Sequence, residues 1–195
     1  MTLRLLKPLL AAAALSALTV AAAHAAAPAA KPAAKPAAAK PAAPAGAAPA
    51  KIPNFDARDP QSLSLLLQQV NAQAKVGKPV NGQVPMEIST PGGAFGAQLI
   101  GCDANGKACH AVAFFTAFEK KGATLAQIND FNRAQLACRG ILTPDGRPSV
   151  MYPVMLNQRM TSDEMRLHLG VWQGCLTAFG EFARDPDAFL SKPHS

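Results

Sequence analysis

The stretch AFGAQLIGCDANGKACHAVAFFT, residues 94–116, decides the fold, because it reads as two apolar strands separated by Asn105-Gly106. Asn-Gly between apolar runs favours a two-residue hairpin loop of type I′, in which both central residues need a positive φ. With these two residues as the loop, Cys102 lies directly opposite Cys109. The stretch therefore predicts an antiparallel β-hairpin with a cysteine pair near its end.

The register of this hairpin assigns each side chain to one of two faces. One face carries Phe95, Ala97, Leu99, Val112, Phe114 and Thr116, and the other carries Gln98, Ile100, Cys102, Cys109, Ala111 and Ala113. We expect the first face to form the core side. His110 falls on that side, so we expect a packed histidine rather than a ligand.

Residues 1–25 have the features of a Sec-type signal peptide. MTLRLLK is a basic start, PLLAAAALSALTVAAA is an apolar stretch, and Ala23-His24-Ala25 is a small-x-small cleavage site. The apolar stretch is shorter than the ~20 residues that a spanning helix needs, so we expect no integral membrane span after cleavage. These features predict export to the periplasm.

Residues 26–53, AAPAAKPAAKPAAAKPAAPAGAAPAKIP, are rich in Ala, Pro and Lys. A segment of this composition has too little apolar surface to form a core, so we expect a disordered linker with polyproline II character. Contact between its lysines and anionic envelope polymers is the functional interpretation, and a plain disordered leader is the alternative.

The leader and the linker account for most of the basic charge of the chain. Six of the 19 Lys and Arg residues precede Asp56, whereas all 12 Asp and Glu residues lie from Asp56 onward, which leaves the remainder near +1. A nearly neutral domain has no basic surface for nucleic acid, so we expect no nucleic-acid partner. Residues 54–195 have the size of one ordinary domain.

Four cysteines in an exported chain favour disulfide formation. Opposed strand neighbours have Cα atoms about 4.5–5.5 Å apart, which suits a Cys102–Cys109 disulfide. A free thiol pair and a metal site are the alternatives. The remaining pair is then Cys138 with Cys175, for which buried free thiols are the alternative.

Helix and strand signals give residues 54–195 the order α-β-β-β-α-β-β-α. Asp59-Pro60 begins a helix whose apolar stripe continues to Ala74, and Gly77 ends it. A strand with Val84, Met86 and Ile88 then precedes the hairpin. This order predicts an α+β fold, a single domain with helices packed on an antiparallel sheet.

Two capping boxes begin the later helices. Thr124-x-x-Gln127 opens a helix that we expect to reach Leu136, and Thr161-x-x-Glu164 opens the longest helix. Between these helices, we expect two strands on either side of a Pro-Asp-Gly turn, at 139–143 and 149–156.

A proline and two glycines in the C-terminal half of the chain predict local features of a strand and a helix. Pro153 lies within the second of these strands and suggests a sheet edge or a bulge. Gly170 and Gly174 lie four residues apart on the longest helix, where small residues allow another element to approach closely.

This series of features resembles the YbjN family. The resemblance rests on GCDANGKACHAVAFFTAF at 101–118, on the run INDFNR at 128–133 and on a last helix with Trp172, and it covers about Asp59 to Phe182. Members of this family are described as sensory-transduction regulators, and their fold is similar to that of type III secretion chaperones. The resemblance implies an interaction module and names no reaction.

The sequence contains no recognisable catalytic or metal-binding constellation. Cys102 and Cys109 are not a Cys-x-x-Cys pair, their spacing fits no common zinc pattern, and no Gly-x-Ser-x-Gly elbow is present. We therefore expect no catalytic residue, no metal and no cofactor. Asn129, Asn132 and Arg133 are candidates for binding a polar partner, although asparagines here more often hold a helix against neighbouring backbone.

Two functional hypotheses arise from these observations. The first is an exported, non-enzymatic interaction module that binds a protein or an envelope component. The alternative is a thiol–disulfide redox protein of the envelope, in which the bond between Cys102 and Cys109 is labile.

Overall fold

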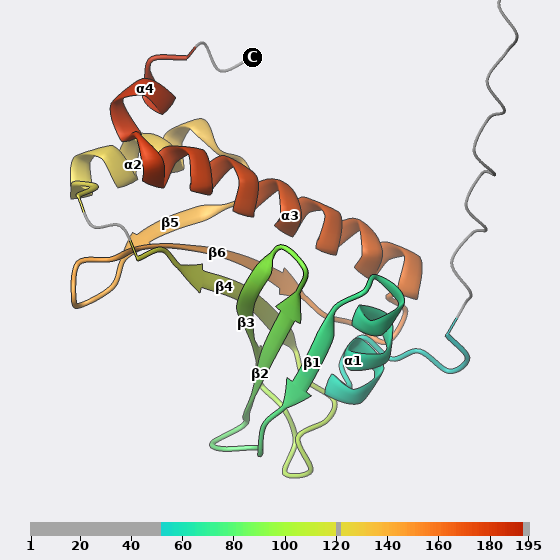
Figure 1. Cartoon of the computed structure of the whole chain (residues 1–195). Helices are drawn as coiled ribbons and strands as arrows, with labels where there is room; N and C mark the ends of the chain where they lie inside the picture. The colour runs from blue at the N-terminus through green and yellow to red at the C-terminus, as the bar shows by residue number, and fades with distance from the viewer. Residues whose placement is uncertain (1–51, 120–121, 193–195) are drawn as a thin grey trace, which may run out of the picture. The chain divides into compact units, whose positions relative to one another are not determined.

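The computed structural model describes residues 52–119 and 122–192, which belong to one compact unit, Gly46–Ser195. The predicted signal peptide and residues 26–51 of the predicted linker lie outside the described residues. The elements in chain order are α1 (Pro60–Gln69), β1 (Gln73–Val76), β2 (Gln83–Thr90), β3 (Gly93–Ile100), β4 (Ala111–Ala117), α2 (Leu125–Ala134), β5 (Arg139–Leu142), β6 (Pro148–Met155), α3 (Ser162–Arg184) and α4 (Pro186–Leu190). These helices and their antiparallel sheet confirm the predicted α+β class (Figure 1).

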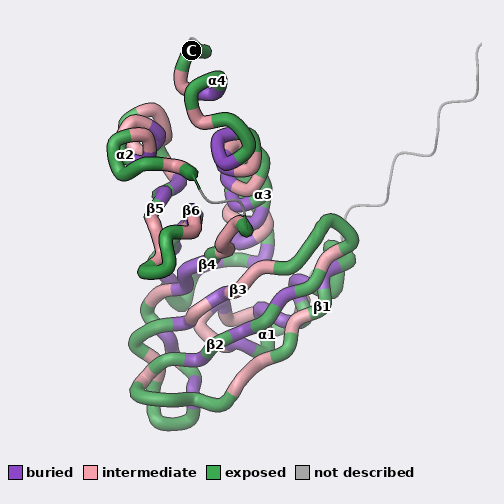
Figure 2. Tube along the Cα trace, turned by 60° about the vertical axis from the view of Figure 1, so that its left-hand side comes forward, coloured by how far each residue is buried: buried purple, intermediate pink, exposed green. Residues whose placement is uncertain are grey.

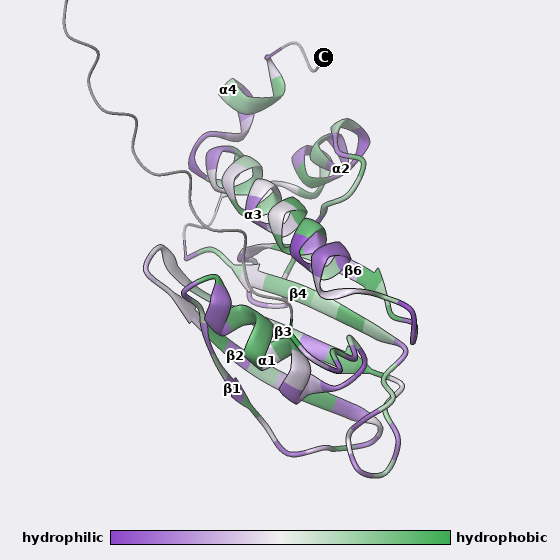
Figure 3. Ribbon diagram, turned by 90° about the vertical axis from the view of Figure 1, so that its right-hand side faces the viewer, coloured by the Kyte–Doolittle hydropathy of each residue, from purple (hydrophilic) through white to green (hydrophobic). Residues whose placement is uncertain are grey.

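The strands form one sheet in the order β1-β2-β3-β4-β6-β5, and every neighbouring pair is antiparallel. Helix α3 lies across one face of this sheet, and α1 lies on the same side, next to β1 (Figures 1 and 3). Helices α2 and α4 lie near the C-terminal end of α3 (Figure 1). The sheet thus has one face packed against helices and a second face that no described helix covers.

The core lies between the sheet and the helices, and the buried positions alternate along the strands (Figure 2). Trp172 of α3 packs against Phe95 and Phe114, with ring centroids 5.6 and 6.1 Å away. A second aromatic cluster joins α2, the end of α3 and α4, and it consists of Phe131, Phe179, Phe182 and Phe189.

The predicted pairing of β3 with β4 is confirmed. Leu99 pairs with Val112 and Ala97 pairs with Phe114, and all four side chains are buried in the core. The face chosen as the core side from the alternation is therefore the one that packs against the helices.

The loop between β3 and β4 differs from the predicted type I′ turn. Only Gly106 of the Asn105-Gly106 pair has a positive φ, 73°. The turn begins at Asp103, whose carbonyl accepts from Gly106 N at 2.9 Å and whose carboxylate accepts from Asn105 N and Lys107 N. Ala108, with φ 52°, adds one residue to the returning strand, and Cys109 is still bonded to Cys102 across the hairpin.

The prediction that His110 packs in the core is wrong. His110 is exposed, whereas Cys109 is fully buried. The left-handed conformation of Ala108 interrupts the alternation of the strand, and the backbone N–H of Cys109 donates to Arg58 O at 3.1 Å. The imidazole of His110 lies over Gly101 instead.

The first helix is shorter than predicted, because it ends at Gln69 rather than near Gly77. Asn71 adopts φ 58°, and Ala72 N and Asn71 N donate to the carbonyls of Leu67 and Gln68. This is a Schellman motif, in which asparagine takes the left-handed position that glycine usually occupies. The chain then forms β1, an edge strand that the sequence did not predict.

Later boundaries also differ in places. Helix α2 ends at Ala134, before the predicted Leu136. Strand β6 lies between β4 and β5 and is therefore not an edge strand of the sheet. Because β5 pairs only with the first half of β6 and begins opposite Met151, Pro153 lies past the start of β5, where β6 has a neighbour on one side only. A Cβ at Gly170 or Gly174 would have no neighbouring atom within 4 Å, so the prediction of a close approach by another element there is wrong.

Candidate interaction face

The second face of the sheet carries the side chains that alternate with the core. In β2, Val84, Met86 and Ile88 are buried among the helices, so the residues between them point the other way. The described helices all place their buried side chains in the core on the covered side. We call the opposite surface the open face.

The strand register shows which residues of the open face are neighbours. Three rows cross the sheet from β2 to β6: Glu87–Gly96–Phe115–Met151, Pro85–Gln98–Ala113–Pro153 and Gln83–Ile100–Ala111–Met155. Most of these side chains are apolar, and the rows form one continuous surface across the sheet.

The open face is uncharged at its centre. Strands β3, β4 and β6 contain no Asp, Glu, Lys or Arg. Charged side chains lie at its margins, where Lys75 of β1 faces Glu87 at 3.6 Å and Arg139 lies on β5. An antiparallel sheet with one solvated face usually carries polar side chains on that face.

Large apolar side chains on the open face are accessible to solvent. Met155 is 74% exposed, and Phe115 and Ile100 are each 40% exposed. Ile141 of β5 is exposed to a similar extent, at 43%. Because these residues lie on neighbouring strands, they form a patch rather than scattered single residues.

Phe115 also shapes the open face. A Cβ on Gly96 would lie 2.5 Å from Phe115 Cζ, so the ring lies directly over this glycine. Between β2 and β4, a shallow hollow of about 470 Å³ is lined by Pro85, Ala94, Gly96 and Phe115, among other residues. The glycine thus gives the face an aromatic ring next to a depression.

The candidate residues on α2 lie away from the open face. Asn132 Oδ1 accepts from Gly140 N at 2.7 Å, and Asn132 Nδ2 donates to Gly140 O at 3.0 Å. Asn132 therefore fastens α2 to β5, so its amide holds a helix against neighbouring backbone, which was the alternative to binding a polar partner. Asn129 is exposed, and Arg133 is paired with Asp130 on the same helix.

The structure contains both cysteine pairs expected from the sequence. Cys102 and Cys109 are joined with Cα atoms 3.8 Å apart, and Cys138 and Cys175 with Cα atoms 5.6 Å apart. The second bond fastens the start of β5 to the middle of α3. Disulfides of this kind persist in oxidising compartments.

The shifted titratable groups belong to local structure rather than to a reaction centre. Hydrogen bonds from the Arg58 side chain lower the pKa of Asp56, and burial raises the pKa of Tyr152. The backbone N–H of Thr161, in a helix cap, lowers the pKa of Glu164. Within residues 52–119 and 122–192, no group of three or more His, Cys, Asp or Glu residues is placed to hold a metal ion.

Comparison with protein-family models, curated proteins and solved structures gives no match for this chain. In the part of the chain that the structure describes, no helix combines the length and the apolar character needed to cross a membrane.

The sequence assigned Gln98, Ile100, Ala111 and Ala113 to the second face of the hairpin but did not identify that face as a site. The available signal was the absence of charge from three strands. This signal alone does not identify an exposed face, because a strand buried on both faces also lacks charged residues. The positions of the helices are needed to distinguish the two cases.

Proposed function

We propose that this chain is an exported, non-enzymatic interaction module that binds another polypeptide through the open face. The observation that carries the proposal is the uncharged centre of this face, where half-exposed apolar side chains lie on neighbouring strands without a described covering element. Exposed apolar patches with polar margins are typical of protein-binding surfaces.

The chemistry of the face defines the partner. An uncharged, apolar polypeptide surface suits its centre, since burying an unpaired charge there would be costly. Phe115 and Met155 are residue types that protein interfaces favour, and both are accessible. Lys75, Glu87 and Arg139 at the margins provide polar contacts around the apolar centre.

Export to the periplasm is the second part of the proposal. It is supported by the signal-peptide features of residues 1–25 and by the two disulfides. The resemblance to YbjN sensory-transduction regulators supports a role in interaction rather than catalysis. For residues 26–53, we retain contact with anionic envelope polymers as a proposal.

Thiol redox chemistry has less support. Cys109, Cys138 and Cys175 are buried, and Cys102 is only partly exposed. A redox-active disulfide needs a sulfur that an attacking thiolate can reach. The buried sulfurs favour a structural role for both bonds.

Site-specific photo-crosslinking in cells tests the proposed binding face. A photoreactive phenylalanine analogue at position 155 is compared with the same analogue at position 167, because Met155 and Leu167 are 74% and 72% exposed on different surfaces. We expect a discrete protein adduct at position 155 that Phe115→Glu abolishes, and none at position 167. Equal adducts at both positions, or no adduct at position 155, would contradict the proposal.

A further inference from the structure

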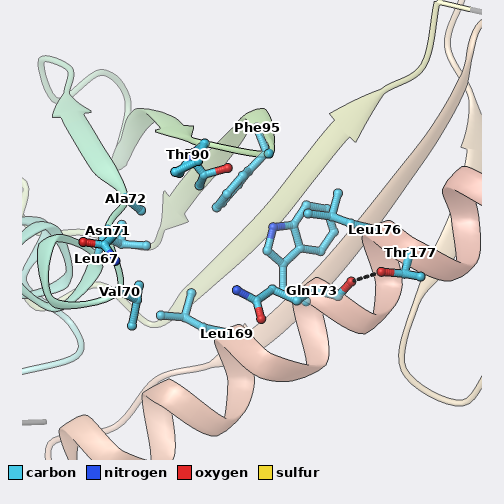
Figure 4. Close-up of a pocket in the computed structure, with 13 residues that line it drawn as sticks. Leu67, Val70, Asn71, Ala72, Thr90, Phe95, Leu169, Gln173, Leu176 and Thr177 are labelled. Atoms are coloured by element: carbon cyan, nitrogen blue, oxygen red, sulfur yellow. Dashed lines mark hydrogen bonds between the residues drawn. The ribbon is translucent and has the colours of Figure 1, made fainter. Parts of the chain in front are cut away.

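A groove on the covered side of the sheet lies apart from the open face. It lies between the end of α1, the turn joining β2 to β3 and the middle of α3, and has a volume of about 450 Å³ (Figure 4). In this view, Leu67 and Asn71 lie on one side, Leu169 and Gln173 on the other, and Phe95 lies across from α3. Pockets for small ligands commonly have volumes of roughly 300–1,000 Å³.

The groove has an apolar floor and an uncharged polar rim. Its lining includes no Asp, Glu, Lys, Arg or His. The floor contains Leu67, Ala72 and Trp172, all of which are buried, whereas Asn71 and Gln173 at the rim are exposed. This distribution suits a ligand with an apolar body and an uncharged polar head.

The rim hydroxyls already donate within the chain. Thr177 Oγ1 donates to Gln173 O at 3.1 Å, and Thr90 Oγ1 donates to Gly93 O at 2.8 Å. Each hydroxyl proton is thus occupied, while the oxygen remains able to accept. The side-chain amides of Asn71 and Gln173 supply further donors at the rim.

The floor contains a buried donor without an acceptor. Trp172 is 1% exposed, and its Nε1 has no hydrogen-bond partner among the described residues. The rings of Phe95 and Phe114 pack against the indole, but a ring provides no oxygen or nitrogen lone pair. Buried donors nearly always have partners. Trp172 Nε1 has almost no accessible surface, so an acceptor that enters from the groove reaches it only when the lining side chains move apart.

We infer that the groove binds an uncharged amphiphile whose carbonyl oxygen accepts a hydrogen bond from Trp172 Nε1–H. An acyl ester with a neutral head fits these requirements: the chain occupies the apolar floor and the head lies between the rim amides. A charged head is disfavoured, because the groove provides no opposite charge to compensate its desolvation.

Tryptophan fluorescence reports on this groove without a label, since Trp172 is the one tryptophan of the chain. Purified protein is titrated with glycerol monodecanoate below its aggregation concentration, and with decanoate and decyltrimethylammonium as charged ligands of the same chain length. We expect a saturable change in tryptophan fluorescence with the ester and at least about tenfold weaker binding of both charged ligands. The single indole N–H resonance should move downfield when the ester binds.

A pair of variants tests the location. Val70→Arg introduces a charge at the groove, and Leu167→Arg introduces the same charge at an exposed position of α3 outside it. We expect Val70→Arg to weaken ester binding at least about tenfold and Leu167→Arg to leave it unchanged. Equal loss in both variants, equal binding of all three ligands, or an unmoved indole resonance would overturn the inference. No polypeptide partner is used, so the outcome is independent of the open face.

Discussion

At the scale of single residues, hydrogen bonds to backbone decide several positions that look alike in the sequence. Asn71, Asn129 and Asn132 all lie in or beside helices, yet Asn71 takes a left-handed conformation at a helix end and Asn132 fastens α2 to β5. Asn129 is merely exposed. Composition does not distinguish these roles, because each depends on which backbone lies next to the side chain.

The two hydrogen bonds between Asn132 and Gly140 predict that Asn132 contributes more to stability than Asn129 does. Asn132→Ala leaves the partly buried N–H and carbonyl of Gly140 without their partner, and we expect a loss of about 1–3 kcal/mol in the free energy of unfolding. Asn129→Ala, on the same helix, should change it by less than about 0.5 kcal/mol. Urea denaturation measures both, and equal effects would contradict the assigned role of Asn132.

Tyr152, the one tyrosine of the chain, predicts a pH dependence at high pH. Burial raises its pKa, and its hydroxyl oxygen lies 2.7 Å from His168 Nδ1. Because the pKa is higher in the folded state, the stabilisation is present below the unfolded value of about 10 and is lost as pH rises through the folded value.

Near-ultraviolet absorbance measures this titration directly, since it reports tyrosinate formation. We expect a midpoint above about 10 in folded protein and near 10 in urea. In Tyr152→Phe, the alkaline loss of stability should be smaller. A folded midpoint no higher than the midpoint in urea would show that burial does not govern this phenol.

At the scale of elements, the sequence predicted most of the sheet and missed the features that depend on tertiary contact. The pairing of β3 with β4 is predicted by apolar alternation, and the capping boxes correctly place the starts of α2 and α3. The loop at 101–110 could not be predicted in the same way, because Lys107 pairs with Asp59 and the Cys109 N–H donates to Arg58 O on a distant segment.

Two missed elements had local signals. Asp185-Pro186 begins α4 with the same Asp-Pro pattern that correctly predicted α1. The end of α1 also had a local signal in Asn71, a residue type that can take the left-handed position after a helix, but the prediction followed the apolar stripe to Ala74. Ala74 pairs with Ile88 across the β1–β2 ladder, so a strand residue continued a helical pattern by coincidence.

The glycines of α3 predict a gain in stability. Gly170 and Gly174 lie in the helix interior with open space where a methyl group would be placed, so Gly170→Ala and Gly174→Ala should each add roughly 0.5–1 kcal/mol. Gly140→Ala is the contrasting change, because its Cβ would lie 2.8 Å from Phe179 Cε2. Thermal denaturation should rank Gly140→Ala below the natural chain and both α3 variants above it.

The disulfides predict unequal contributions to stability. Their sequence separations are 37 and 7, so loop-closure entropy gives about 4 kcal/mol for the Cys138–Cys175 bond and about 2.5 kcal/mol for the Cys102–Cys109 bond. Paired replacement by alanine, followed by urea unfolding, compares them. A larger loss from the short loop would show that entropy does not set the order.

At the scale of the whole molecule, the sheet separates two surfaces of different chemistry. The covered side contains the core and a small neutral groove, and the open face presents an uncharged strip across β3, β4 and β6. The sequence could assign residues to faces within one hairpin. It could not show that no described helix lies over the second face, because this depends on where all of these helices pack.

Methionine oxidation tests the central claim, that a polypeptide covers the open face, most directly. Met155 is 74% exposed, and Leu167→Met places a reporter of similar exposure on α3. Dilute purified protein should oxidise at both positions at similar rates. In intact cells, we predict that Met155 is protected while position 167 remains reactive. Oxidation of Met155 in cells as fast as at position 167 would contradict the claim.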